Sequence, residues 1–221
     1  MLKLKIVQNG TFVMTPEKGV IDNRPTCSLI ESQGLNALDK WYVLIDLDHP
    51  AKKSSDLVTS LAAFNVSPKE INVVIFTHLH PDHMGHKDLF PNALFIFHKD
   101  EKLSFHFKHN KTLELEGDAV YDLSENGWPQ YMDGMPDLRK LGNYLYIKHC
   151  PGHTKGSLVM FACIEKMIFA FVGGIFLNKS YYENWQPPGM SWNQEIIYDH
   201  MRFIQEHANV IVPGHGKPFI I

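Results

Sequence analysis

The sequence predicts a single α+β domain in which two halves rich in β-strands pack face to face, with helices on the outside. The first half of the 221 residues shows strands, then a helix, then further strands, and the second half shows strands, a helix and a final strand. No linker, exact repeat or low-complexity segment separates the two halves. We therefore expect residues 1–221 to form one domain.

Strands dominate the first half. The predicted strands are LKLKIV (2–7), TFVM (11–14), CSLIES (27–32), WYVLIDL (41–47), INVVIF (71–76) and ALFIFH (93–98). Apolar and polar residues alternate in the first of them, as in a half-buried strand. The pair Asn9-Gly10 follows it and favours a hairpin between the first two strands. The apolar run INVVIF predicts a strand that is buried on both faces.

Helical spacing first occurs in SSDLVTSLAAFN (54–65). Leu57, Leu61 and Phe64 are four and three residues apart, so they share one face of a helix. The residues whose side chains can cap its N-terminus are Ser54, Ser55 and Asp56. HKDEKLSF (98–105) predicts a second, shorter helix.

The second half begins after a polar region with two short predicted strands, TLEL (112–115) and AVYD (119–122). The longer predicted strands are LYIKHC (145–150), SLVMFAC (157–163), KMIFAFV (166–172) and NVIV (209–212). A long loop over residues 174–193 is rich in Tyr, Trp and Pro, and residues 193–207 form a predicted helix. Ile197, Met201 and Ile204 share one face of that helix.

Composition excludes several classes of protein. Hydrophobic residues make up 44% and charged residues 20%, as in soluble globular proteins. The net charge of −3, with scattered Lys and Arg, disfavours a nucleic-acid partner. No run approaches the roughly 18 apolar residues of a membrane span, and the N-terminus does not resemble a signal peptide. We expect a cytoplasmic protein without a membrane partner.

The cysteines Cys27, Cys150 and Cys163 show no CxxC spacing and are expected to be reduced thiols.

The stretch THLHPDHMGH (77–86) holds four histidines and one aspartate directly after a predicted strand. Imidazole nitrogen and carboxylate oxygen are good ligands for zinc and similar metals. Residues two apart in extended backbone point the same way, so His78 and His80 can face one centre. The chain bends after the following proline, and Asp82 and His83 can therefore reach a second point nearby.

Two more histidines follow predicted strands within the local sequence Pro-Gly-His. His153 comes after residues 145–150, and His215 comes after residues 209–212. Three loops at strand ends therefore offer ligands that one fold can bring together. His86 can lie beside such a site, and His49 can border it. The remaining histidines are most simply surface or helix residues: His98, His106, His109, His149, His200 and His207.

THLHPDHMGH, PGHT and PGHG, in this order and at these distances, resemble the metallo-β-lactamase superfamily. The segment IDLDHP (45–50) resembles the strand-end aspartate segment of that family, with Asp46 or Asp48 as the residue that supports the ligands. The resemblance covers nearly the whole chain and is greatest to the short, single-domain members. It implies a four-layer αββα sandwich with the metals at one edge.

The resemblance also implies two ligand sets and one departure from the family pattern. The first set is His78, His80 and His153, and the second set is Asp82, His83 and His215. Zinc is the expected metal, one or two ions per chain, with iron or manganese as alternatives. Members with two bridged metals carry Gly-Asp where this chain has Gly173 and Gly174. Without that carboxylate two dications repel each other more, so double occupancy is harder.

The expected function is a metal-dependent hydrolase. The resemblance implies that a metal-bound hydroxide attacks an ester, thioester, lactone or lactam, with Asp82 as the catalytic group that orients it and moves its proton. Two alternatives stay open: a metal-dependent phosphodiesterase or nuclease, and a non-catalytic metal-binding protein because of Gly174. A small-molecule substrate is expected, and a homodimer is left open.

The aromatic side chains of the 174–193 loop have two interpretations. They can form a wall or lid beside the site, where they would stack on an apolar substrate or donate a phenol hydrogen bond. Alternatively, they pack the loop down onto the body of the protein. The residues concerned are Tyr181, Tyr182, Trp185 and Trp192.

Overall fold

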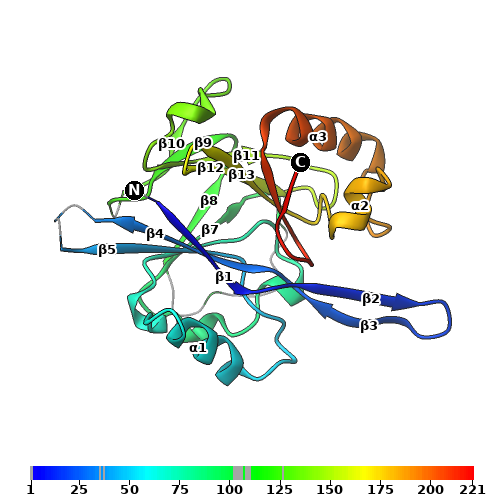
Figure 1. Cartoon of the computed structure of the whole chain (residues 1–221), viewed down its shortest axis with the longest axis horizontal. Helices are drawn as coiled ribbons and strands as arrows, with labels where there is room; N and C mark the ends of the chain where they lie inside the picture. Colours follow the sequence, from blue (N-terminus) through cyan, green and yellow to red (C-terminus); the bar gives the residue numbers. More distant parts are fainter. Residues whose placement is uncertain (1, 35, 37, 102–106, 108–110, 126) are drawn as a thin grey trace.

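The computed structural model of the protein describes residues 2–34, 36, 38–101, 107, 111–125 and 127–221. Two β-sheets lie face to face, with helix α1 on the outside of one and helices α2 and α3 on the outside of the other (Figure 1). This arrangement confirms the predicted α+β sandwich with four layers. That residues 1–221 form a single domain stays a prediction.

The first sheet has six strands in the order β1-β4-β5-β6-β7-β8. Their bounds are β1 Lys3–Gln8, β4 Cys27–Gln33, β5 Lys40–Ile45, β6 Val73–Ile75, β7 Leu94–His98 and β8 Lys111–Leu115. The strands from β5 to β8 are parallel, whereas β1, β4 and β5 pair antiparallel. Parallel neighbours bring their carboxyl ends to one edge, so the chain after β6 and after β7 emerges on the same side.

The second sheet has seven strands in the order β10-β9-β11-β12-β13-β14-β15. Their bounds are β9 Ala119–Asp122, β10 Gln130–Tyr131, β11 Tyr144–His149, β12 Leu158–Ile164, β13 Met167–Gly173, β14 Val210–Pro213 and β15 Phe219–Ile220. The helices are α1 Ser54–Ala62, α2 Lys179–Glu183 and α3 Gln194–His207, and the 3-10 turns are Pro68–Glu70, Pro81–His83, Lys87–Leu89 and Leu138–Lys140.

The alternation of side chains along β6 divides the core into layers. Val73 and Ile75 point into the cluster between the sheets, and Val74 joins the separate cluster beneath α1. The strand is therefore buried on both faces, as its apolar sequence predicts. Leu57 and Leu61 of α1 are buried against the outer face of the first sheet. Residues Ile197, Met201 and Ile204 of α3 are likewise buried on the outer face of the second sheet.

The hairpin predicted at Asn9-Gly10 is wrong. Strand β1 pairs with β4, whereas β2 (Thr11–Thr15) pairs with β3 (Gly19–Arg24) in a separate two-stranded sheet. That hairpin, called the β2–β3 arm below, projects from the body beside β1 (Figure 1). Gly10 is needed for a close approach instead of a turn, because a Cβ there would lie 2.6 Å from the Cα of His215.

Three local predictions also differ from the structure. The N-cap of α1 is Lys53, one residue earlier than predicted, and no side chain caps the helix. Residues 99–101 after β7 form a turn instead of a helix, and the rest of the predicted helix 98–105 falls mainly outside the described residues. The 174–193 loop contains the short helix α2.

Among the described residues, no helix has the length and apolar character needed to cross a lipid bilayer.

Candidate metal centre

The six predicted ligands lie together at one edge of the sandwich. His78 and His80 follow β6, the 3-10 turn Pro81–His83 comes directly after them, and His153 and His215 follow β11 and β14. Each loop therefore starts at the carboxyl end of a strand, where the backbone leaves the sheet and side chains can converge. Two groups form there: His78, His80 and His153, called the three-histidine group, and Asp82, His83 and His215, called the aspartate group.

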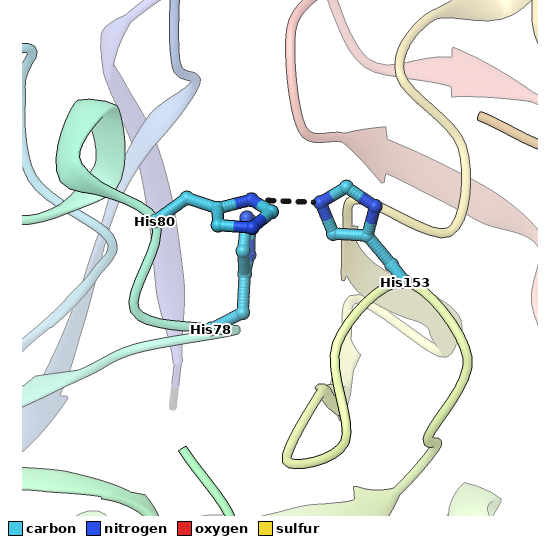
Figure 2. A group of neighbouring side chains, drawn as sticks. All are labelled: His78, His80 and His153. Carbon is cyan, nitrogen blue, oxygen red and sulfur yellow. Dashed lines mark hydrogen bonds between the residues drawn. The ribbon is translucent and has the colours of Figure 1, made fainter. Parts of the chain in front are cut away.

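The three-histidine group has the spacing of a tetrahedral ligand set. One ring nitrogen from each residue lies within 4.8 Å of the other two, and His80 Nδ1 is 3.1 Å from His153 Nε2 (Figure 2). Two nitrogens bound at about 2.05 Å to one tetrahedral ion lie about 3.3 Å apart. The rings stand nearly perpendicular to one another, with interplanar angles of 82° to 88°, so their edges converge on one point.

The aspartate group shows the same convergence. His83 Nε2 lies 3.3 Å from His215 Nε2. Asp82 Oδ2 completes the triangle at 3.5 Å from the first nitrogen and 3.6 Å from the second. These two nitrogens and one oxygen leave a coordination position open for water or substrate, which is the arrangement of catalytic zinc sites.

Neighbouring groups hold the Nδ1 atoms of two of the imidazoles, one in each ligand group. His83 Nδ1 lies 2.9 Å from Asp46 Oδ2, and His78 Nδ1 lies 3.0 Å from Thr77 Oγ1. Thr77 in turn donates its hydroxyl and its backbone N–H to the two oxygens of Asp46. A buried carboxylate therefore fixes the orientation of both rings, which is how metal-ligating histidines are usually supported.

Of the two aspartates that the sequence offers for this role, Asp46 fills it. Asp48 accepts hydrogen bonds from Gln8 and from the backbone of His49 instead. His215 relies on the backbone, since its Nδ1 lies 3.0 Å from the carbonyl oxygen of Arg24.

Burial keeps most of these imidazoles neutral. It lowers the pKa of His78 well below its usual range, and together with neighbouring histidines it lowers the pKa of His153 to about 3 and of His215 to about 4. His83 differs: burial opposes its protonation, but the carboxylates of Asp46 and Asp82 outweigh burial and raise its pKa. Neutral imidazoles are the form that binds a metal, so the donors present fit divalent cations.

Gly174 is tightly packed and not merely a position that lacks a carboxylate. A Cβ at Gly174 would lie 2.0 Å from Cδ2 of His153 and 2.5 Å from its Nε2. The His153 ring therefore occupies the space that any side chain at this position would need. Gly173 is constrained as well, because its φ is +48° and its Cβ would meet the Thr77 side chain.

A cavity of about 520 Å³ opens above both groups. His78, His80, Asp82, His153 and His215 lie on one side of it. The other sides are largely apolar and come from the β2–β3 arm and the 174–193 loop, through Phe12, Met14, Val20, Leu177, Pro188 and Met190. Asn23 of the arm also lines the cavity and donates its Nδ2 to Asp82 Oδ2 at 3.0 Å.

The aromatic residues of the 174–193 loop divide between the two interpretations. Tyr181 lines the cavity and contacts Phe12 edge to face. Tyr182 and Trp185 pack against Phe176 in the cluster beneath α3, so they hold the loop onto the body. Trp192 does not line the cavity; its ring lies under the ammonium group of Lys155 and half of the residue is exposed.

A third cluster lies apart from these groups. His98, Asp100 and His149 also bring ligand atoms within 4.8 Å of one another. The two imidazole rings, however, are stacked with centroids 3.7 Å apart and an interplanar angle of 11°. The nitrogen lone pairs of two stacked rings lie in two separate, nearly parallel planes, so they do not converge on one ion. His98 and His149, called the stacked pair below, therefore form a contact between β7 and β11, and their present geometry is not that of a metal site.

The expectations for the other histidines are met only in part, because His98, expected on the surface or in a helix, is buried in β7. His49 and His86 do not line the cavity, and His200 and His207 lie in α3. His106 and His109 fall outside the described residues. Sequence reasoning assigned no role to Thr77, which precedes His78 in the same loop, or to Asn23 and Glu101, which contact the ligand loops from other elements.

Comparisons with known proteins agree with this geometry. A family model described as "Metallo-beta-lactamase superfamily" matches residues 42–170. Metallo-beta-lactamase domain-containing protein 1 of Xenopus laevis is 29% identical over 181 residues, covering 80% of this chain and 67% of that protein. A probable metallo-hydrolase of Methanocaldococcus jannaschii is 26% identical over 160 residues, covering 72% of this chain and 64% of that protein.

Among solved structures, a quorum-quenching N-acyl homoserine lactone lactonase superposes with a TM-score of 0.67 at 18% identity. The match covers 97% of this chain and 91% of that one. At this identity the structural likeness shows a shared fold. The two relatives named above match this chain over about two thirds of their own length. The family model covers more than half of the chain, and the ligand loops lie where its fold brings them together. The chain belongs to the metallo-beta-lactamase superfamily, a superfamily of metallo-hydrolases.

Proposed function

We propose that this protein is a metal-dependent hydrolase that cleaves an ester, thioester, lactone or lactam bond in a small molecule. One observation carries the proposal: two groups of metal-ligating side chains lie side by side on the wall of one largely apolar cavity. Ligand groups buried in a structural site would have no such opening, whereas a catalytic site keeps a position open toward its substrate.

The chemistry is divided between the metal and the chain. A divalent metal, when bound, acts as a Lewis acid and supplies a water of lowered pKa. We propose zinc, with one or two ions per chain, and iron or manganese would suit the same donors. The six ligands would hold it: His78, His80 and His153 in one group, and Asp82, His83 and His215 in the other.

Asp82 is the proposed catalytic residue. Burial opposes its ionisation, but His83 and His215 outweigh burial and lower its pKa, so it stays a carboxylate. Its side chain lines the cavity, where it can orient a water and accept a proton. Asn23 holds one of its oxygens by the 3.0 Å hydrogen bond and thereby restricts its rotation.

The walls of the cavity favour an uncharged, partly apolar substrate. Phe12, Met14 and Val20 face it from the β2–β3 arm, and Met190 faces it from the opposite loop. Apolar walls exclude water and contribute binding energy in proportion to the apolar area that they cover. Among the described residues that line the cavity none is Lys or Arg, which disfavours the alternative of a phosphodiester or nucleic-acid substrate.

The test compares two reaction classes on the same zinc-loaded protein. We expect turnover of aryl esters and lactones that exceeds turnover of bis-p-nitrophenyl phosphate. His80→Ala should abolish that turnover, whereas His207→Ala, a matched substitution at the C-terminal end of α3 and outside the cavity, should leave it unchanged. Faster cleavage of the phosphodiester would contradict the proposal in favour of a phosphodiesterase. No turnover of either substrate by protein that retains its metal would favour a non-catalytic metal-binding protein.

A further inference from the structure

A buried carboxylate connects the two loops that carry the three-histidine group. Glu101 follows β7, and only 8% of the residue is exposed. The backbone N–H of Leu79, which lies between His78 and His80, donates to Glu101 Oε2 at 3.1 Å. The hydroxyl of Thr154, the residue after His153, donates to Glu101 Oε1. One side chain therefore bonds to the neighbours of all three ligands.

The loop that carries His153 is built to receive this carboxylate. The Thr154 hydroxyl also lies 2.7 Å from Ser157 Oγ, which accepts a hydrogen bond from the Thr154 backbone. The backbone of Gly156 contributes a further hydrogen bond to Glu101. A Cβ at Gly156 would lie 2.8 Å from Cγ of Glu101, so this approach requires glycine. The Thr154 hydroxyl and the Gly156 backbone thus both bond to the Glu101 carboxylate, and Ser157 holds the Thr154 hydroxyl in place.

The position of this carboxylate matters because the two loops start from different sheets. His78 and His80 leave the first sheet after β6, whereas His153 leaves the second sheet after β11. Their separation therefore depends on the links between the sheets at this edge. Besides Glu101, the backbone hydrogen bond from Leu158 to the Thr77 carbonyl, at 2.7 Å, connects the same two segments.

The aspartate group is held by other residues. Asp46 supports His83, and the Arg24 carbonyl supports His215. Within the part of the chain that the structure describes, the hydrogen-bond partners of Glu101 are Leu79, Thr154 and Gly156, and none of the three ligands of the aspartate group is among them. A change at Glu101 should therefore act on one group and spare the other.

We propose that Glu101 is a positioning residue for the three-histidine group: its carboxylate sets the spacing between the His78–His80 segment and the His153 loop, and so sets the metal affinity of that group alone. Residues that orient metal ligands in this way typically change metal affinity by about tenfold to a hundredfold when they are replaced. The test measures metal affinity and not turnover, so it is independent of the substrate.

The experiment separates the two groups with background substitutions. His215→Ala leaves the three-histidine group intact, and His153→Ala leaves the aspartate group intact. Zinc affinity is measured in both backgrounds by competition with a chromophoric chelator, with and without Glu101→Ala. Asp100→Ala, which removes the neighbouring half-exposed carboxylate, is the matched control. Thermal melting of the zinc-free proteins shows whether each variant is folded.

We expect Glu101→Ala to weaken zinc binding about tenfold to a hundredfold in the His215→Ala background and less than about threefold in the His153→Ala background. Glu101→Gln keeps one oxygen as an acceptor and should lose less zinc affinity than Glu101→Ala. The glutamine variant also provides the test if the alanine variant does not fold. Three results would overturn the proposal: an equal loss in both backgrounds, no loss in the His215→Ala background, or no zinc binding by the His215→Ala protein itself.

Discussion

The two ligand groups lie beside each other but are supported in different ways. The aspartate group contains an anionic ligand and rests on a second carboxylate, Asp46, which raises the pKa of His83. The three-histidine group has only neutral ligands, and its geometry depends on close packing, with the His153 ring against Gly174. The comparison teaches that a carboxylate contacts a ligand of the aspartate group directly, through Asp46 and His83. In the three-histidine group the carboxylates act through intervening residues: Asp46 through Thr77, and Glu101 through Leu79 and Thr154.

The largest expected effect comes from removing a ligand of the three-histidine group. His80→Ala should lower hydrolysis on the order of 10³-fold or more, because the water bound there would no longer have a lowered pKa. Steady-state rates and zinc content, measured on the same sample, check this. Retained turnover by metal-loaded His80→Ala protein would remove this group from the proposed mechanism.

A substitution at Gly174 tests whether packing supports the three-histidine group. Restoring the aspartate of the family pattern, by Gly174→Asp, should not create a better binuclear centre here. The new Cβ would displace the His153 ring, and we expect zinc affinity in the His215→Ala background to fall about tenfold to a hundredfold. Gly117→Asp, at a glycine with open space around it and outside the cavity, is the matched control. Tighter zinc binding by Gly174→Asp would contradict the packing argument.

Replacing Asp46 tests whether charge supports the aspartate group. Asp46→Asn keeps the shape of the side chain but removes the charge next to His83, so zinc binding in the His153→Ala background should weaken about tenfold. Zinc titrations in both backgrounds measure this. The loss should be smaller in the His215→Ala background, where Thr77 still contacts His78. A larger loss there would reverse the assignment of the two supports.

The stacked pair offers a titration outside both ligand groups. Burial, and secondly the nearby His149, lower the pKa of His98 in the folded protein to about 4. In the unfolded chain this histidine has a pKa of about 6.5, so between these two pH values the unfolded state binds a proton that the folded state does not. Stability of the zinc-free protein should therefore fall between about pH 6.5 and 4. His98→Phe should reduce that slope by up to roughly 1.4 kcal/mol per pH unit. Urea unfolding over this pH range measures it, and an unchanged slope would contradict the assignment.

The smallest effect concerns the apolar wall. Met14→Ser on the β2–β3 arm removes an apolar side chain from the cavity without touching either ligand group. We expect KM for esters with an apolar acyl group to rise about threefold to tenfold, with zinc affinity unchanged. Met135→Ser, at an exposed position outside the cavity, serves as the control. Equal KM values for Met14→Ser and the control would place the substrate elsewhere.

Sequence alone predicted the sandwich and all six clustered residues because their signals are local. Strand and helix periodicities are visible within a few residues, and the ligands lie in loops that follow strands. The β2–β3 arm was predicted wrongly because Asn9-Gly10 favours a turn locally, whereas pairing of β1 with β4 depends on contacts across the fold.

The supporting residues could not be predicted in the same way. Glu101 and Asn23 reach the ligand loops from segments that are distant in sequence, and nothing in their local sequence indicates this contact. Gly174 stood out in the sequence as a missing carboxylate. Only the position of the His153 ring shows that a side chain there has no space.

The central claim, that six residues form two separable metal-binding groups, is tested most directly by zinc content per chain in three proteins. Elemental analysis would be run on the wild type, His153→Ala and His215→Ala after equilibration with excess zinc and removal of unbound metal. The account predicts about one equivalent in each variant and more than one in the wild type. No zinc in either variant, or no difference among the three proteins, would contradict it.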